Sequence, residues 1–329
     1  MKSFEYSAPN TIEEAIESLG NRWGETEIMA GGTDLVTSLK QRITAPQRVV
    51  SLKNISTLRE IHESSDLIQI GAMTTLADLS NHSTIQKHFP SLVEAARSIS
   101  SPQILNAGTL GGDLCQRPRC WYFRNGYGLL AQNGGKSLIP AGDNRYHAIF
   151  GNDGPAYFVS ASSLGPPLIA LGASVSVVGA DGKSRQIALD DFFRIPKSES
   201  ERETSLKPNE ILTAIHIPLS GLNNSVYEIR HRHGLDWPYA TAAVAFKLSG
   251  SKASDVRIVL GHVAPTPWLA SKAGKSLEGA EVTMSSAAHC AQSATQGAKT
   301  LSGNAYKVPM VKTSVKRAIL IAAGIQMKG

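Results

Sequence analysis

Two glycine-rich segments, each set among small and polar residues, most constrain what this chain can fold into. They are residues 30–35 (Ala-Gly-Gly-Thr-Asp-Leu) and residues 106–113 (Asn-Ala-Gly-Thr-Leu-Gly-Gly-Asp). Glycine lets the backbone approach a ligand closely and adopt positive φ, so such segments can wrap a flat, polar cofactor. A Gly-Gly segment taken alone is more often just a turn. Together they predict two loops, both presenting hydrogen-bond donors, that clamp one extended dinucleotide from two sides.

The first segment lies between a predicted strand and a predicted helix. Residues 27–30 (Glu-Ile-Met-Ala) are predicted to form a short buried strand, and residues 35–40 are predicted to form a short helix. Backbone N–H groups at such a junction, together with the helix N-terminus, can receive a pyrophosphate, and Thr33 adds a hydroxyl donor. The glycine spacing matches neither the Gly-x-Gly-x-x-Gly fingerprint nor a P-loop, so the pattern does not support a Rossmann or Walker site.

The other patterns divide the 329-residue chain into successive units of mixed helix and strand. This length suggests two or three domains. Strands are predicted at residues 48–52, 67–72, 174–178, 185–189, 214–218, 226–229, 240–247 and 255–261. Helices are predicted at residues 10–20, 75–79, 91–98, 167–173, 284–298 and 309–323. Residues 124–154 are rich in glycine and asparagine and weakly periodic, which predicts a long excursion.

The cysteines argue against both a disulfide framework and a metal site. Three cysteines in the whole chain cannot form such a framework, which favours a reducing compartment. Cys115 and Cys120 follow the second glycine segment directly, and His147 is a third candidate ligand. A structural zinc or a four-iron cluster wants four ligands, and no clear fourth is present. We therefore expect free thiols.

Charge and hydropathy exclude further classes of function. The net charge is +6, and the basic excess lies in residues 221–329, where no acidic residue follows Glu281. This part could face a protein, a cofactor or solvent, and it lacks the aromatic and arginine-rich surface of a single-strand binder, so no nucleic-acid partner is expected. No apolar run reaches the length of a membrane span.

A dense polar cluster occupies residues 230–233 (Arg-His-Arg-His) together with Asp236. It could hold the anionic edge of a cofactor or carry a proton to it, and it would equally suit an exposed face. No Ser/His/Asp or Cys/His arrangement and no glycosidase-like carboxylate pair stands out. The residues themselves therefore assign no catalytic group to this chain.

The two glycine segments, in this order and at this spacing, resemble the two FAD signatures of the flavoprotein (medium) subunits of the molybdenum hydroxylases. This family includes the xanthine dehydrogenase and carbon monoxide dehydrogenase flavoproteins. The resemblance covers essentially the whole chain and extends to residues 162–173, 209–212 and 301–307. It implies an α+β fold: a two-subdomain FAD-binding domain of the vanillyl-alcohol oxidase (PCMH) type, then a C-terminal α/β domain of the carbon monoxide dehydrogenase flavoprotein type. The implied boundaries are 1–56, 57–220 with an insertion at about 115–157, and 221–329.

The resemblance also implies which residues contact FAD. Residues 30–35 would cradle the pyrophosphate, the second segment would contact the ribityl and phosphate region, Leu164 would flank the flavin, and Arg232 would lie near the ring. The implied set is Ala30, Gly31, Gly32, Thr33, Asp34, Leu35, Gly108, Thr109, Gly111, Gly112, Asp113, Leu164 and Arg232. Asparagine is common in the family at position 113 and aspartate at position 163, where this chain has Asp113 and Ser163. Asp113 can still accept a hydrogen bond from a ribose or ribityl hydroxyl.

Residues 115–153 resemble an insertion found in hydroxybenzoyl-CoA reductase and aldehyde oxidoreductase flavoprotein subunits. Some members hold a [4Fe–4S] cluster there through four cysteines. This chain keeps Cys115 and Cys120 but has no cysteine between residues 124 and 153, which argues against a cluster and against any metal site here.

The function that the resemblance implies is electron transfer within an oxidoreductase complex. FAD would take electrons from iron–sulfur clusters of a partner and pass them to an external acceptor, with Arg232 stabilising negative charge on the reduced ring. The implied partners are a molybdopterin-binding large subunit and a small [2Fe–2S] subunit, in a heterotrimer or a dimer of heterotrimers. The implied location is cytoplasmic, or periplasmic by co-export with a partner. Two alternatives stay open: a structural subunit with a degenerate flavin site, and a free-standing flavin oxidase.

Overall fold

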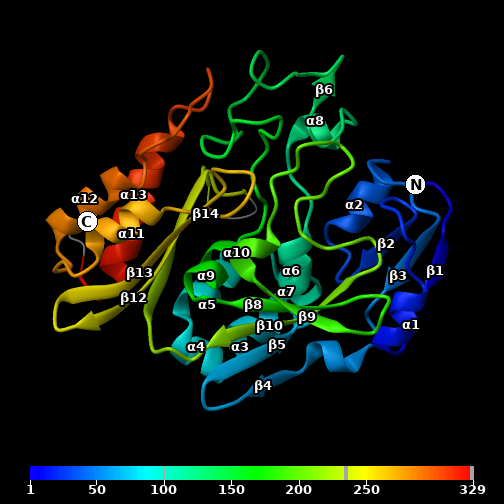
Figure 1. Cartoon of the computed structure of the whole chain (residues 1–329), viewed down its shortest axis with the longest axis horizontal. Coiled ribbons are helices and arrows are strands. Elements are labelled where there is room, and N and C mark those ends of the chain that lie inside the picture. The colour runs from blue at the N-terminus through cyan, green and yellow to red at the C-terminus, as the bar shows by residue number, and fades with distance from the viewer. Residues whose placement is uncertain (100, 233–235, 327–329) are drawn as a thin grey trace.

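The computed structural model describes residues 1–99, 101–232 and 236–326. These residues form three sheets that follow one another along the chain, with helices between and around them (Figure 1). The sheets fall within residues 1–56, 57–220 and 221–329, while the boundaries themselves stay a prediction. A short two-stranded ribbon, β6 (Gln132–Asn133) with β7 (Lys136–Ser137), lies apart from the three sheets.

The N-terminal unit is a small parallel sheet covered by helices. Its strand order is β1-β3-β2, with bounds β1 (Glu5–Ser7), β3 (Arg48–Ser51) and β2 (Thr26–Met29). Helix α1 (Ile12–Glu17) is capped by Thr11, whose hydroxyl accepts from the Glu14 amide. The helix is shorter at both ends than the predicted 10–20. Helix α2 (Leu35–Lys40) starts directly after the first glycine segment. That segment therefore joins β2 to α2, as its pattern predicts.

The second unit is an antiparallel sheet of order β4-β5-β10-β8-β9. The first pair, β4 (Ile61–Glu63) and β5 (Leu67–Gly71), is followed by helices α3 (Leu76–Asn81), α4 (Ser83–His88) and α5 (Pro90–Arg97). The other strands, β8 (Ser174–Val178), β9 (Ser184–Ala188) and β10 (Ile211–Pro218), come much later in the chain. After β5 the chain leaves the sheet. It returns first as β8 and β9 and then as β10, which pairs with β5 at the centre of the sheet.

The segment between α5 and β8 carries the second glycine segment and the excursion. It forms α6 (Pro102–Ala107), α7 (Leu110–Cys115), α8 (Trp121–Arg124) and, after the ribbon, α9 (Gly165–Ala170). Gly111 and Gly112 thus lie in a helix that Thr109 caps, where the sequence predicted a loop. The expected long excursion is confirmed, since β6 and β7 are its only regular elements among described residues 125–164.

The C-terminal unit is an antiparallel sheet with helices on one face. Its strands are β11 (Asn223–Ile229), β12 (Ala240–Ser249), β13 (Lys252–Gly261) and β14 (Trp268–Leu269). Helices α11 (Ser271–Leu277), α12 (Met284–Ser293) and α13 (Lys307–Ala322) pack against it, with α12 ending earlier than predicted. Helices α5 and α9 of the second unit contact the same sheet. Figure 1 shows these two helices beside β12 and β13, on the side away from α13.

Candidate functional site

The two glycine segments meet in space, with no room for a side chain between them. A Cβ atom built on Gly31 would lie 1.7 Å from the carbonyl oxygen of Ala107 and 3.1 Å from the Gly108 nitrogen. Gly32 has a φ of +75°, which favours glycine over a residue with a side chain. Both glycines of the first segment are therefore required by the backbone itself. The contact supports the prediction that the two segments act together.

The first segment presents an uninterrupted row of backbone donors. Among the described residues, no acceptor within the chain is present for the N–H groups of Gly31, Gly32, Thr33, Asp34 or Leu35. Unpaired N–H groups at a helix N-terminus form a concave, partly positive surface that suits an anion. This arrangement is compatible with the pyrophosphate-binding role that the sequence predicts for the first segment, and that role stays a prediction.

The second segment uses most of its N–H groups internally. The Gly111 amide donates to Ala72 O at 2.8 Å, and the Gly112 amide donates to the Thr109 hydroxyl at 3.1 Å. A Cβ atom on Gly111 would lie 2.8 Å from the Cβ of Ala72, so this glycine permits packing of α7 on the end of β5. The expectation that both segments present donors is therefore wrong for most of the second one. The segment lines the cavity, while most of its N–H groups are paired within the chain.

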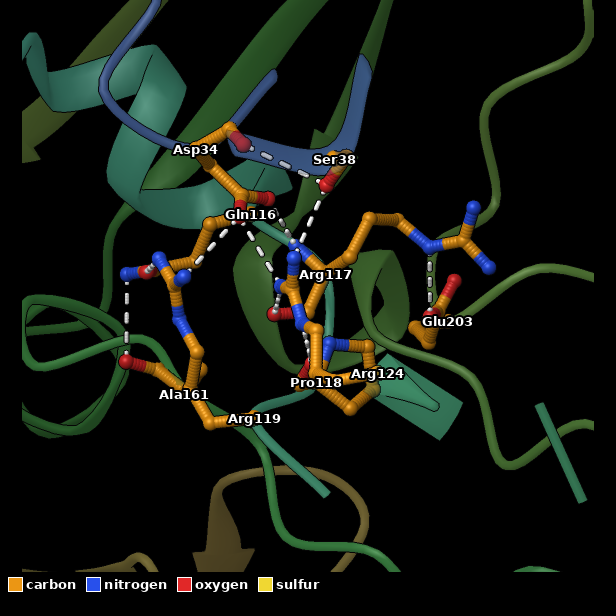
Figure 2. A network of polar contacts seen from close by, with 9 residues as sticks. All are labelled: Asp34, Ser38, Gln116, Arg117, Pro118, Arg119, Arg124, Ala161 and Glu203. Carbon is orange, nitrogen blue, oxygen red and sulfur yellow. Dashed lines mark hydrogen bonds and ion pairs between the residues drawn. The ribbon is translucent and has the colours of Figure 1, made fainter. Parts of the chain in front are cut away.

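Asp34 connects the first glycine segment to the start of the excursion (Figure 2). Its carboxylate accepts from the Arg117 amide at 2.9 Å and from the Arg124 guanidinium at 2.9 Å. The Arg119 guanidinium adds an ion pair at 3.1 Å. Arg124 also donates to the Ser38 hydroxyl at 2.8 Å, so it holds both ends of the first turns of α2. The side chain of Asp34 is thus committed to the protein, and its backbone amide remains for a ligand.

Asp113 holds a different segment against the site. Its carboxylate accepts from the Ser162 hydroxyl at 2.5 Å, from the Leu164 amide at 3.0 Å and from the Gln116 side-chain amide at 2.9 Å. Burial raises the pKa of Asp113 from 3.8 to about 6, and the hydrogen bond from Ser162 only partly opposes this shift. These partners occupy the Asp113 carboxylate oxygens, which the sequence predicts to accept from a ribose or ribityl hydroxyl.

These elements enclose a cavity of about 600 Å³, which we call the first cavity. That volume lies within the range of small-molecule and cofactor sites. The predicted residues that line it are Ala30, Gly31, Gly32, Thr33, Asp34, Leu35, Gly108, Thr109, Gly111, Gly112 and Asp113. Leu164 is fully buried and does not line this cavity. Its backbone amide donates to the Asp113 carboxylate instead. Ser163, where the family commonly has aspartate, does line it.

Arg232 lies elsewhere, beside a second cavity of about 360 Å³. Its exposed guanidinium pairs with Asp236 at 3.2 Å. His233, which the sequence places in the same polar cluster, lies outside the described residues. Arg119 and Trp237 line both cavities, so the two are neighbours, and the Arg119 guanidinium carbon lies 4.9 Å from the Trp237 ring centre.

The two cysteines near the second glycine segment lie in different surroundings. Cys115 lines the first cavity, whereas Cys120 lines the second and lies 3.2 Å from His147 Nε2. All three cysteines are free thiols, as the sequence predicts. Within the described residues, no group of three or more His, Cys, Asp or Glu side chains could hold a metal ion.

Several residues that shape these cavities were not predicted from the sequence. They include Arg119, Arg124, Glu203, His262 and Lys307. The cluster of three arginines within residues 117–124 was a visible signal, since charged side chains near a binding segment need partners. No local pattern, however, shows that their partner is Asp34, which lies much earlier in the chain.

Two known domain families match this chain, and together they identify the family to which it belongs. Residues 2–220 match the FAD binding domain in molybdopterin dehydrogenase, and residues 225–322 match the CO dehydrogenase flavoprotein C-terminal domain. The chain belongs to the FAD-binding (medium) subunits of the molybdenum hydroxylases. This flavoprotein subunit is 32% identical to the carbon monoxide dehydrogenase medium chain of Hydrogenophaga pseudoflava, over 96% of both chains. It is 29% identical to the aldehyde oxidoreductase FAD-binding subunit PaoB of Escherichia coli, over 82% of this chain and 84% of that one.

Solved structures agree with the fold of this flavoprotein subunit. Carbon monoxide dehydrogenase from Hydrogenophaga pseudoflava, in a form that lacks the Mo-pyranopterin moiety of the molybdenum cofactor, gives a TM-score of 0.76 at 30% identity over 98% of both chains. Quinoline 2-oxidoreductase from Pseudomonas putida 86 also gives 0.76, at 25% identity, over 98% of this chain and 99% of that one. The predicted fold, the family and the class of oxidoreductase subunit are therefore confirmed. No helix in the described part of the flavoprotein subunit has the length and apolar character that a membrane span requires.

Proposed function

We propose that this flavoprotein subunit binds FAD in the first cavity and relays electrons from an iron–sulfur partner to an external acceptor. The observation that carries this proposal is the row of five unpaired backbone N–H groups at residues 31–35, facing a cavity that the second glycine segment closes. A diphosphate fits such a row, because each N–H can donate to a phosphate oxygen without displacing a bond inside the protein.

The chain's own residues would fix and shield the cofactor. Backbone donors of residues 31–35 would hold the diphosphate, and the Thr33 hydroxyl would add a donor at the cavity wall. Asp34 and its arginines would keep α2 and the excursion in register, so that the donor row keeps its geometry. Asp113 would hold residues 162–164 in place at the cavity. Bound FAD would supply the redox chemistry, accepting electrons singly and releasing them as a pair.

The partners that we propose follow from the relatives' printed names. These relatives are called medium chains or FAD-binding subunits, as in carbon monoxide dehydrogenase and aldehyde oxidoreductase. We propose a molybdopterin-binding large subunit, where substrate would be oxidised, and a small [2Fe–2S] subunit that would deliver electrons here. A dimer of such heterotrimers and a cytoplasmic location complete the proposal.

The test compares ligands that differ in their phosphates. The purified protein should be yellow, or become yellow with FAD, and should bind FAD far more tightly than riboflavin, which has no phosphate. Thr33→Val should weaken FAD binding by about five- to tenfold, the equivalent of one lost hydrogen bond. Thr37→Val, on an exposed turn of α2 outside the cavity lining, should leave it unchanged.

Absence of FAD binding would overturn the proposal and favour the structural-subunit alternative. Equal affinity for riboflavin and FAD would overturn the role of the donor row. Full turnover of a substrate by the isolated chain would favour the free-standing oxidase instead.

A further inference from the structure

The second cavity has features of a ligand site that the proposed FAD site does not use. It lies between the excursion and the C-terminal sheet, where residues around positions 120, 146, 160, 239 and 262 converge. Its aromatic wall is a connected series of rings. Tyr146 and Tyr239 are stacked with centres 5.7 Å apart, and Trp121 meets Tyr146 edge-on at 5.7 Å. Such a wall suits a planar ring, because flat aromatic surfaces stack on one another.

Polar atoms without partners are concentrated around the same cavity. Three of the buried side-chain atoms that lack a hydrogen bond among the described residues belong to its lining: Arg119 Nε, His147 Nδ1 and His262 Nε2. Buried polar groups normally find a partner, and the exceptions call for a ligand, a water or another explanation. His262 is 2% exposed, so solvent reaches little of it.

The orientation of His262 selects the kind of group it can bind. Its Nδ1 lies 3.0 Å from the hydroxyl of Thr241, which does not line the cavity. Burial lowers the pKa of His262 to about 3, so the ring is neutral and carries one N–H. The Thr241 hydroxyl can donate to Nδ1; in that tautomer the ring N–H is on Nε2, which has no partner among the described residues and is available to a carbonyl oxygen.

The surrounding charge also favours a ligand that gains negative charge on its oxygens as it is reduced. The amino group of the buried Lys307 donates to the backbone carbonyl of Tyr146 at 2.9 Å and to that of His262 at 2.8 Å. Burial lowers the pKa of Lys307 to about 7, so this amino group is partly protonated near neutral pH. Arg119 and Arg232 add positive charge, and Asp236 is the one carboxylate among the described lining residues. None of the described lining residues is a glycine, so the cavity lacks the close-approach loop that a second dinucleotide diphosphate would use.

We propose that the second cavity binds a planar quinone-type electron acceptor, with the Tyr146–Tyr239 stack as its ring wall and the His262 imidazole donating to one of its carbonyl oxygens. The inference rests on the proposed function, because the electrons come from the neighbouring first cavity, which shares Arg119 and Trp237 with this one. The quinone would take up two electrons and two protons, each C=O becoming C–O–H, and the fully reduced flavin would supply both electrons and release the same number of protons as it returns to oxidised FAD.

The experiment uses menadione, a water-compatible naphthoquinone, and the full-length protein with its FAD. Binding is measured by quenching of tryptophan fluorescence, since Trp121 and Trp237 line the cavity. Reoxidation of the chemically reduced flavin by menadione is followed by absorbance in the same samples. His262→Leu should raise the dissociation constant about tenfold through loss of one buried hydrogen bond, and Tyr146→Leu about fivefold through loss of stacking. Tyr6→Leu is the matched control and should behave as wild type, because Tyr6 is also an exposed tyrosine (56%, against 44% for Tyr146) but lies on β1, away from the cavity lining.

Flavin content, read from the same spectra, separates the two proposals. A protein that holds FAD but binds menadione equally well in all variants overturns the quinone site and leaves the FAD proposal standing. Quenching of the same tryptophan fluorescence by NAD⁺, with none by menadione, overturns the quinone site as well. If His262→Leu does not fold, the 44% exposed Tyr146 provides a variant that decides the question alone.

Discussion

The backbones at Gly31 and Ala107 approach so closely that a methyl group added to Gly31 would lie 1.7 Å from the Ala107 carbonyl oxygen. Gly31→Ala must therefore push the two glycine segments apart. We expect a loss of about 1–3 kcal/mol in the free energy of unfolding, together with reduced FAD content. Denaturant unfolding and flavin absorbance measure the two effects. Gly154→Ala is the control, because nothing lies within 4 Å of its added Cβ, and equal behaviour of the two variants would contradict the close approach.

Removing the Arg124 side chain should destabilise the junction between α2 and the excursion. Arg124→Ala leaves the Asp34 carboxylate with fewer partners and removes donors to Ser38 and to two backbone carbonyls. Because the Arg124 side chain is only 11% exposed, we expect a loss of about 2–4 kcal/mol, compared with less than about 1 kcal/mol for an exposed pair. Lys299→Ala, which breaks the exposed pair with Asp153, supplies that comparison in the same unfolding assay. Similar losses in both variants would show that the Asp34 network adds nothing.

Asp113 should make stability depend on pH in an unusual direction. Burial raises its pKa from 3.8 to about 6, so between these values the folded protein keeps a proton that the unfolded chain releases. Its contribution to stability is present below about pH 4 and is lost as the pH rises through about 6. Asp113→Asn has no such titration. The difference in unfolding free energy, wild type minus variant, should fall by on the order of 2–3 kcal/mol between these pH values. A difference that does not change with pH would contradict the raised pKa.

The cysteines should resist alkylation in the folded protein. Burial raises the pKa of Cys115 to about 12 and that of Cys290 to about 11, and it also raises the pKa of Cys120. The thiolate is the reactive form, so all three should react slowly with iodoacetamide near neutral pH. Mass spectrometry after labelling, with a guanidinium-unfolded sample as the reference, reports each site separately. Rapid labelling of Cys115 without unfolding would show that the first cavity opens to solvent.

The first glycine segment was predictable because its signal is local. A short apolar strand, two glycines and a helical pattern follow one another, and the structure keeps that order. The second segment was less predictable, because α6 and α7 are only six residues each. Helices of this length are stabilised by tertiary packing rather than by propensity, and here Gly111 rests on Ala72.

The surroundings of the site depend on contacts between distant parts of the chain. Asp34 reads as a cofactor residue in the sequence, yet its carboxylate is held by arginines of the excursion. Arg232 reads as a neighbour of the flavin, yet it lines the second cavity. His262 belongs to no motif, and Lys307 ends segment 301–307, whose pattern gives no sign of a cavity. The two residues are brought together because His262 follows β13 and Lys307 begins α13. Periodicity and motif spacing describe neighbours along the chain, so they cannot reveal such pairings.

The row of unpaired N–H groups at residues 31–35 has a consequence for how the subunit is kept intact. These donors lie directly after β2 in the N-terminal unit, whereas the second glycine segment lies in the next unit. A ligand that contacts both segments links the two units. It stabilises the folded subunit by mass action, by about 2.7 kcal/mol when its concentration is a hundred times the dissociation constant. In a cell short of flavin, we expect the N-terminal 56 residues to open first and to be the earliest target of proteolysis. Limited proteolysis with and without FAD would reveal this, so cofactor supply would govern subunit lifetime as well as electron flow.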